Sequence, residues 1–313
     1  MTQFTGPLDN FLTLALLTIF GVWVHGEGGL STIFMVSAAG TLAMISCVHP
    51  VAMWVASKRG LGASQANKSR EQWWQLIVHV SMTALNAGIF LFADNEDGLW
   101  TTTPHAVDAR VSLVYKVQAA IWFVTAFRHR FYGMDSRNKD YVLMYVHHIV
   151  TLLLIVWSYA NDWNCHRGGA YVLFLHDASD IVIDVLRLSH NLRLDADAGL
   201  YFAEISFATN FATWTYFRLY RFPLFIYSSW NAEINVLHSA LSLTCVVLLI
   251  IHVYWYYLFG RIAVKLALGV DHHKAGEDYE GADDGGDGGS SGGGALKKKK
   301  SSKKSGKLPK KSQ

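Results

Sequence analysis

Two histidines and two hydroxyl side chains interrupt an otherwise apolar stretch at residues 141–160. His147 and His148 are adjacent, and Thr151 and Ser158 follow at helical spacing. At about 100° per residue, these four side chains fall within roughly one quadrant of a helix, and leucine, isoleucine and valine cover most of the rest. An ionisable group inside an apolar span is costly, so it normally faces the interior of a helical bundle and marks a functional site.

A second apolar stretch, at residues 170–187, repeats this pattern with more charge. One quadrant of its helix holds His176, Asp177, Asp180, Asp184 and Arg187. A short segment joins the two stretches, so we expect the two helices to pack antiparallel with their polar quadrants facing each other. We therefore predict that His147, His148, Asp177 and Asp180 form one hydrogen-bonded cluster.

The composition is that of a membrane protein. Hydrophobic residues make up 51% of the 313 residues and charged residues only 16%, against ~25% charged in a soluble domain. A soluble globule and a coiled coil are excluded. The three cysteines are scattered, and no basic segment precedes the first apolar run. We therefore expect no disulfide framework, no zinc site and no cleaved signal peptide.

About eight stretches are long and apolar enough to cross a bilayer, which takes ~20 mainly apolar residues. They are expected near 10–24, 31–56, 73–93, 111–127, 141–160, 170–187, 200–220 and 234–260. Lysine and arginine gather in every second connecting segment, which predicts that both termini are cytosolic. The expected fold class is an all-α polytopic membrane protein with about eight transmembrane helices.

The end of the chain differs from the rest. Residues 271–313 hold ten lysines, seven acidic residues and ten glycines, whereas the first 270 residues carry seventeen basic and seventeen acidic residues. Such a segment cannot bury a core, so we expect a disordered cytosolic C-terminal tail. Lys310 and Lys311 stand four and three residues from the end. They resemble a dilysine retrieval signal, which predicts location in the endoplasmic reticulum membrane.

Metal-dependent lipid chemistry does not fit the histidine pattern. Di-iron desaturases and hydroxylases use several histidine clusters, whereas His147 and His148 are the one adjacent pair before the tail. Fatty-acid elongases carry an HxxHH motif, and here Met144 stands at its first position. No G-x-S-x-G, P-loop or Rossmann glycine pattern occurs. Three further histidines stand alone in their spans and are expected to be hydrogen-bonded packing residues: His79, His238 and His252.

Together, the polar residues of the two stretches resemble the ceramide synthase signature of the TLC-domain family. The matching positions are His147, His148, Thr151, Ser158, Tyr159, Asn164, Arg167, Gly169, His176, Asp177, Ser179, Asp180, Asp184 and Arg187. Two extra residues precede Asn164, and Asp184 and Arg187 stand where the family often has Glu and Lys. No homeobox-like segment lies between the second and third spans, so the chain is similar to the shorter family members.

The resemblance implies a TLC-type helical bundle. N-terminal membrane helices would occupy 1–62, a catalytic membrane domain 63–265 and the tail 266–313. It also implies N-acylation, in which a fatty acyl-CoA thioester and the amine of a sphingoid base give ceramide and free CoA. No metal or other cofactor is expected. The implied partners are fatty acyl-CoA, a sphingoid base and membrane lipids, with no nucleic acid, and the family is often found as homo- or heterodimers.

Within this resemblance, His147, His148, Asp177 and Asp180 are the expected catalytic residues. The amine is protonated at neutral pH, and histidine is suited to remove its proton while a carboxylate holds the imidazole in one tautomer. One histidine can instead attack the thioester to form an acyl-imidazole, and the sequence does not choose between these routes. Supporting roles are expected for Thr151, Ser158, Asn164, Arg167, His176, Asp184 and Arg187.

Two other functions stand as alternatives. A non-catalytic TLC-type membrane protein in lipid handling or translocation does not need paired histidines with two aspartates. A proton-coupled transporter would use a buried His/Asp relay, but the sequence shows no sign of inverted repeats. In the family, the loop before the last span influences acyl-chain choice. Here it corresponds to Arg221–Ala232, which names no chain length.

Overall fold

The computed structural model describes residues 7–26, 29–92, 108–133, 141–160, 165–194, 202–231 and 236–268. The chain divides into two compact units, 1–283 and 284–313, and every described residue lies in the first. The tail expected from the composition lies outside the described residues beyond position 268.

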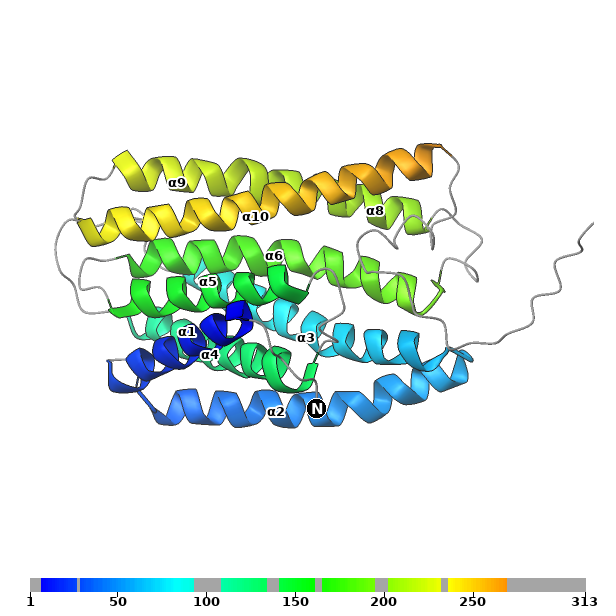
Figure 1. The fold of residues 1–313 in the computed structure, drawn as a ribbon, viewed down its shortest axis with the longest axis horizontal. Helices are drawn as coiled ribbons and strands as arrows, with labels where there is room; N and C mark the ends of the chain where they lie inside the picture. The colour runs from blue at the N-terminus through cyan, green and yellow to red at the C-terminus, as the bar shows by residue number, and fades with distance from the viewer. Residues whose placement is uncertain are drawn as a thin grey trace, which may run out of the picture. The chain divides into compact units, whose positions relative to one another are not determined.

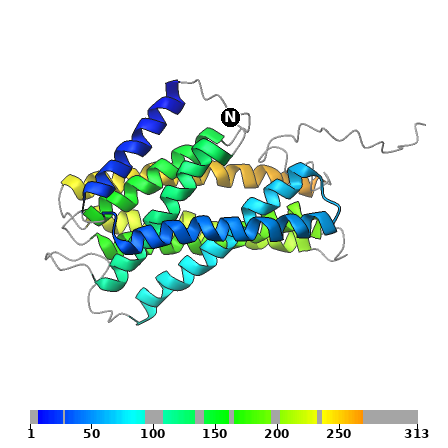
Figure 2. The ribbon, with the colours of Figure 1, turned by 90° about the horizontal axis from the view of Figure 1, so that it is seen from below.

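The described part of the first unit is built of helices. They are α1 (Pro7–His25), α2 (Thr32–Lys58), α3 (Ala63–Phe92), α4 (Ala109–Arg128), η1 (His129–Gly133), α5 (Tyr141–Ala160), α6 (His166–Asn191), α8 (Phe202–Trp214), η2 (Thr215–Arg221), α9 (Phe222–Asn231) and α10 (Val236–Ala267). The helices lie side by side, with α5 and α6 between the layer of α8, α9 and α10 and the layer formed by α2, α3 and α4 (Figure 1). Seen at right angles, α1 leans away from α2 (Figure 2).

Local sequence signals set several helix ends. The Oγ atom of Ser31 accepts a hydrogen bond from the N–H of Phe34 and caps α2. The carboxylate of Asp108 does the same for α4, through the N–H of Arg110. Such caps satisfy backbone donors that the first turn of a helix leaves free. Gly60 has φ of 64°, a conformation that glycine adopts without strain, and it turns the chain from α2 into α3.

The helices are longer than several of the predicted apolar stretches. The stretch expected at 73–93 corresponds to the last two thirds of α3. The helix that begins at Phe202, in the stretch expected at 200–220, continues without interruption through η2 and α9 to Asn231. The expectation of a loop at Arg221–Ala232 was wrong, because Phe222–Asn231 is helical. Phe222, Phe225 and Ile226 in this segment are buried, so tertiary packing stabilises a helix where hydropathy alone predicts the end of a span.

Four helices of the described chain are long and apolar enough to cross a membrane: Pro7–His25, Thr32–Lys58, Tyr141–Ala160 and Ser239–Ala267. Large apolar side chains are exposed on their outer faces, as at Phe11 and Leu14 of α1, Val36 of α2 and Ile250 of α10. A soluble protein seldom exposes so many large apolar side chains to water, whereas in a membrane protein such side chains contact the lipid chains. The described part of the chain is all-helical, and the protein is a multi-pass membrane protein.

α6 holds the central position that the site requires. It packs against α3, α4, α5 and α8 and against η2, so side chains on different sides of α6 meet different neighbours. Its buried residues include several polar ones, whereas the buried faces of α1 and α2 are almost wholly apolar. Polar groups that would be costly in lipid are thereby collected inside the bundle.

Candidate active site

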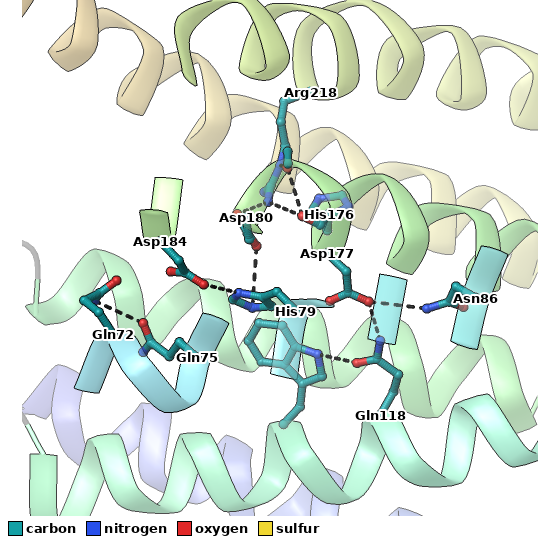
Figure 3. A network of polar contacts seen from close by, with 12 residues as sticks. Gln72, Gln75, His79, Asn86, Gln118, His176, Asp177, Asp180, Asp184 and Arg218 are labelled. Carbon is teal, nitrogen blue, oxygen red and sulfur yellow. Dashed lines mark hydrogen bonds and ion pairs between the residues drawn. The ribbon is translucent and has the colours of Figure 1, made fainter. Parts of the chain in front are cut away.

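Two of the α6 carboxylates face one histidine of α3. The Nδ1 atom of His79 lies 2.6 Å from Oδ2 of Asp184, and its Nε2 atom lies 3.9 Å from Oδ2 of Asp180 (Figure 3). Asp184 is 2% exposed. Because both ring nitrogens of His79 face carboxylates, the imidazole reduces the repulsion between two negative charges in a poorly hydrated interior.

Arg218 approaches one of these carboxylates, that of Asp180, from the side opposite His79 (Figure 3). Its Nη2 atom donates to Oδ1 of Asp180 at 2.5 Å and to the carbonyl oxygen of His176 at 3.1 Å, and its Nε atom donates to Oγ of Ser179 at 2.6 Å. Nη1 lies 2.8 Å from Nε2 of His252. The guanidinium is 1% exposed, so it is a fully buried cation whose donors are directed at fixed acceptors.

The π-helical segment η2 carries Arg218 to this position. The Cζ atom of Arg218 lies 4.7 Å from the ring centroid of Trp214, which is one helical turn earlier in the chain. This adds a cation–π contact. Short π-helical turns inside α-helices often accompany functional sites, because they shift one side chain relative to the regular helix.

Asp177 faces α3 and α4. Its Oδ2 atom accepts hydrogen bonds from Nε2 of Gln118 at 2.5 Å and from Nδ2 of Asn86 at 3.3 Å (Figure 3). Oε1 of Gln118 in turn accepts from Nε1 of Trp122 at 3.0 Å. Two amide donors therefore hold the Asp177 carboxylate, and the network continues from there to an indole ring.

The predicted hydrogen-bonded cluster of His147, His148, Asp177 and Asp180 was wrong in its connections. Across the described residues, no hydrogen bond joins either histidine to either aspartate, and Nδ1 of both histidines is buried without a partner. The link is indirect, because Trp122 lies 5.9 Å from the ring of His147 and 5.5 Å from that of His148. The aspartates are instead satisfied by side chains of α3, α4 and η2.

The two adjacent histidines point in different directions, as neighbours on a helix must. His147 packs edge-on against Trp255 at 5.3 Å and lies 6.3 Å from His252, both on α10. His148 packs against His129 of η1 at 5.1 Å. Only His147 of the pair lines the cavity described next.

A narrow cavity of about 40 Å³ runs between α5, α6, α9 and α10. His147, His176, Asp177 and Asp180 line it together with Trp122. The rest of the lining is mostly apolar or small: Thr151, Leu154, Ile155, Ser158, Cys165, Gly169, Val172, Leu173, Phe225, Ser229, Leu241, Ser242, Cys245 and Leu248. From His147 to Ser158 the lining follows eleven residues of α5, or about 17 Å.

The other predicted residues divide between the cavity and its surroundings. Thr151, Ser158 and His176 line it, and Asp184 lies in the His79 network. Arg167 in the first turn of α6 and Arg187 near its end are half-buried and do not line it. Asn164 and His238 lie outside the residues whose side chains the structure describes.

Sequence analysis missed five members of the polar network: His79, Asn86, Gln118, Arg218 and His252. The expectation that His79 and His252 are hydrogen-bonded was confirmed, because each contacts a charged side chain of another helix. Their place in the network of the α6 carboxylates was not predicted. Arg218 lies inside the stretch predicted at 200–220, so the cost of an ionisable group in an apolar span was the signal that pointed to it. Among the described residues, no group of three or more His, Cys, Asp or Glu side chains has the arrangement of a metal site.

Comparison with known proteins gives a consistent result. The TLC domain family matches residues 68–261. Ceramide synthase 1 of Homo sapiens is 28% identical over 229 residues, covering 66% of this chain and 63% of that protein. Ceramide synthase LOH2 of Arabidopsis thaliana is 28% identical over 155 residues, covering 46% and 49%. Ceramide synthase LOH1 of the same plant is 25% identical over 243 residues, covering 70% and 74%.

The chain thus spans between about half and three quarters of these relatives. The family match includes every residue of the cavity lining and every member of the polar network around Asp177, Asp180 and Asp184. Since the match also covers more than half of the chain, the protein belongs to the TLC-domain family.

Proposed function

We propose that this protein is a ceramide synthase, which transfers a fatty acyl group from acyl-CoA to the amine of a sphingoid base. The observation that carries the proposal is the cavity itself. His147 and two aspartates line it beside mostly apolar side chains. A group suited to acid–base chemistry next to an apolar lining fits acyl transfer between lipids.

The relatives support the same activity, because several of them are named ceramide synthases. In the proposed reaction, the amine attacks the thioester carbonyl, a C–N bond forms and the C–S bond breaks. The ammonium form of the sphingoid base loses two protons. One goes to a histidine before the attack, and the other goes to the leaving CoA thiolate. Acyl-CoA is a substrate, and we propose no cofactor.

His147 is the residue we propose to meet the reacting groups, since it lines the cavity and its Nδ1 atom has no partner among the described residues. It acts as the general base or forms an acyl-imidazole that the amine then displaces. Asp177 and Asp180 also line the cavity, and we propose that they stabilise positive charge developing on an imidazole or on the amine. His148 contacts the rings of Trp122 and His129. We propose that it positions these two rings.

The apolar part of the cavity is proposed to hold the acyl chain. Leucines, an isoleucine, a valine and a phenylalanine line this space, and its lining residues on α5 are spread over about three helical turns. Burying a methylene group stabilises a complex by ~0.8 kcal/mol, so each methylene that enters this space strengthens binding.

We further propose that the chain crosses the membrane of the endoplasmic reticulum eight times, with both termini in the cytosol. The alternation of basic connecting segments supports this arrangement. Fatty acyl-CoA would then reach the site from the cytosolic half of the bilayer. A homo- or heterodimer is proposed in keeping with the family.

The test is an N-acylation assay of the purified protein in detergent with labelled acyl-CoA and sphinganine. We expect His147→Ala to lower the rate by two orders of magnitude or more, as removal of a general base typically does. His148→Ala, Asp177→Asn and Asp180→Asn should each remove most of the activity, because the first loses a positioning contact and the other two lose a charge that stabilises the reacting groups. His166→Gln is the matched control. Its Nε2 atom lies 3.0 Å from the carbonyl oxygen of Tyr159, outside the cavity lining, and it should keep most of the activity.

All variants must elute as the wild type does on gel filtration. If the wild-type protein forms no N-acyl product, the proposed activity is wrong and the alternative of a non-catalytic TLC-type membrane protein is favoured. Near-normal rates for both His147→Ala and His148→Ala would overturn the proposed mechanism.

A further inference from the structure

Asp177 differs from the other charged groups of the cavity in its partners. Both of its hydrogen bonds use the Oδ2 atom and come from neutral amides, Nε2 of Gln118 at 2.5 Å and Nδ2 of Asn86 at 3.3 Å. None of the ion pairs in the described part of the chain includes Asp177. The side chain is 2% exposed and lines the cavity, so a carboxylate without a cation lies at the site.

The neighbouring carboxylate, that of Asp180, already has its cation. Its Oδ1 atom accepts from Nη2 of Arg218 at 2.5 Å, and its Oδ2 atom lies 3.9 Å from Nε2 of His79. A buried charge normally has a partner of opposite charge, because burial removes it from water. Of the two aspartates that line the cavity, Asp177 is therefore the one whose charge a bound cation would balance.

An aromatic ring lies next to Asp177 in the network. Nε1 of Trp122 donates to Oε1 of Gln118 at 3.0 Å, and the amide nitrogen of the same glutamine donates to Asp177. Trp122 is half-buried and lines the cavity together with Asp177. The face of an indole ring attracts a cation, and among aromatic side chains it does so best. One glutamine therefore orients a carboxylate and an aromatic ring that both suit a positively charged ligand.

We propose that Asp177 and Trp122 form a subsite that binds the ammonium head of a long-chain cation. The inference rests on the proposed function and deepens it. It assigns recognition of the charged acceptor to these two residues, and it adds quaternary ammonium lipids as ligands that bind without reacting. The ring of His147 is 5.9 Å from that of Trp122, between centroids, so the proposed base lies beside the bound ammonium. Gln118 is a positioning residue, because it holds both groups and does not line the cavity.

The experiment compares two inert ligands that share one carbon chain and its hydroxyl groups. N,N,N-trimethylsphinganine is permanently cationic and has no lone pair on nitrogen, so it is not acylated. Octadecane-1,3-diol lacks the nitrogen. Each is measured as an inhibitor of sphinganine acylation and, independently of turnover, by the rise in unfolding temperature that it causes in the purified protein. The wild type should bind the cation at least about tenfold more tightly than the diol, because the ion pair and the cation–π contact favour the cation alone.

Three variants test the two groups. Asp177→Asn keeps the size of the side chain and an oxygen that accepts from Gln118, but it removes the charge, so the preference for the cation should fall to about threefold or less. Trp122→Leu and Trp122→Phe both lose the N–H that donates to Gln118, so the difference between them reports the aromatic ring alone. Trp122→Leu should lower the preference by about three- to tenfold, and Trp122→Phe should restore part of that loss.

Trp54→Leu is the control. It removes an indole that is 61% exposed on α2, and it should keep the full preference. Equal binding of the cation and the diol by the wild type would overturn the proposal. An unchanged preference in Asp177→Asn would do the same, and so would an equal loss of both ligands in well-folded Asp177→Asn and Trp122→Leu. If the wild type acylates no amine but binds the cation with this preference, the proposed function is wrong and the subsite stands.

Discussion

His79 of α3 and Asp184 of α6 lie 2.6 Å apart, from Nδ1 to Oδ2, inside the bundle. Asp184 lies on the same side of α6 as His176, Asp177 and Asp180. His79 is the buried side chain that pairs with the carboxylate of Asp184, and it also lies 3.9 Å from that of Asp180. The pair joins two of the helices that carry the polar network, so its first role is to fix α3 against α6 and to hold Asp180 between His79 and Arg218.

Replacing His79 by Leu should destabilise the protein strongly, because it leaves the buried carboxylate of Asp184 without its partner. Removing one member of a buried pair costs about 3–5 kcal/mol, whereas replacing both members by apolar residues costs much less. The double variant His79→Leu/Asp184→Leu should therefore unfold at a higher temperature than His79→Leu alone. Thermal unfolding in detergent, followed by gel filtration, measures this difference.

The more exposed pair of His49 and Glu71, 3.7 Å apart, provides the control. His49→Ala should lower the unfolding temperature less than His79→Leu, because the side chains of His49 and Glu71 are partly exposed and their 3.7 Å contact is long, and such pairs contribute about 0–1 kcal/mol. If the double variant is no more stable than His79→Leu, the two residues are not coupled and the pair has no structural role of its own.

Gln118 should matter to the rate although it does not line the cavity. Gln118→Leu removes the 2.5 Å donor to Asp177 and the acceptor of the Trp122 N–H, so both the carboxylate and the indole beside the two histidines lose their anchor. A misplacement of about 1 Å can cost about a hundredfold in rate, and we expect a ten- to hundredfold loss in the N-acylation assay.

Gln75 offers a comparison, since it is a partly buried glutamine that accepts a hydrogen bond from Gln72 at 3.1 Å and, among the described residues, makes no hydrogen bond to Asp177 or Trp122. Gln75→Leu should retain nearly full activity. Equal rates for the two leucine variants would mean that the orientation of Asp177 does not depend on Gln118.

The sequence predicts the polar faces of α5 and α6 well, because helical periodicity determines which residues share a face. It does not determine which neighbouring helix a face meets. Asp177 was expected opposite the paired histidines, yet its partners are Gln118 and Asn86 on α4 and α3. Arg218 reaches the site through the π-helical segment η2, and the irregular turn has no clear signal in the sequence. Long-range partners thus depend on packing that a single sequence does not encode locally.

Gly169 should not tolerate a side chain. A Cβ atom built there would overlap the hydroxyl oxygen of Tyr115 and lie 3.0 Å from Oγ of Ser158. Tyr115 is fully buried, and its hydroxyl group hydrogen-bonds Ser158 at 3.0 Å and the carbonyl oxygen of His166 at 3.2 Å. Gly169→Ala should therefore destabilise the protein by about 1–3 kcal/mol through overpacking.

Tyr115→Phe removes the oxygen that causes this overlap, so it should suppress part of the defect. The double variant Gly169→Ala/Tyr115→Phe is expected to unfold at a higher temperature than Gly169→Ala, even though Tyr115→Phe alone loses two hydrogen bonds. A double variant less stable than either single one would show that the overlap is not the cause.

We expect the tail, residues 271–313, to determine where the protein is located and to be unnecessary for its activity. A low-complexity segment of this composition cannot bury a core, so deletion of residues 271–313 should leave the N-acylation rate in detergent within about twofold. Replacing Lys310 and Lys311 by Ser in the full chain should let the protein leave the endoplasmic reticulum, which fractionation or microscopy measures. Loss of activity on deletion would assign the tail a role in folding or catalysis.

The orientation of the chain can be tested with glycosylation, because the transferase acts in the lumen. Asn67-Lys68-Ser69 is a sequon near the start of α3, and Asn67 is exposed, yet the basic residues of that connecting segment predict that it is cytosolic. We expect no glycan at Asn67 in microsomes. The absence of a glycan at Asn67 is informative only beside a site that is modified.

The substitution Asp97→Thr provides such a positive control, because it makes a sequon of Asn95 in the acidic segment predicted to be lumenal. That variant should gain one glycan, seen as a shift in mobility that an endoglycosidase removes. Modification at Asn67 with none at Asn95 would invert the topology and would place the acyl-CoA entrance on the wrong side of the membrane for a substrate made in the cytosol.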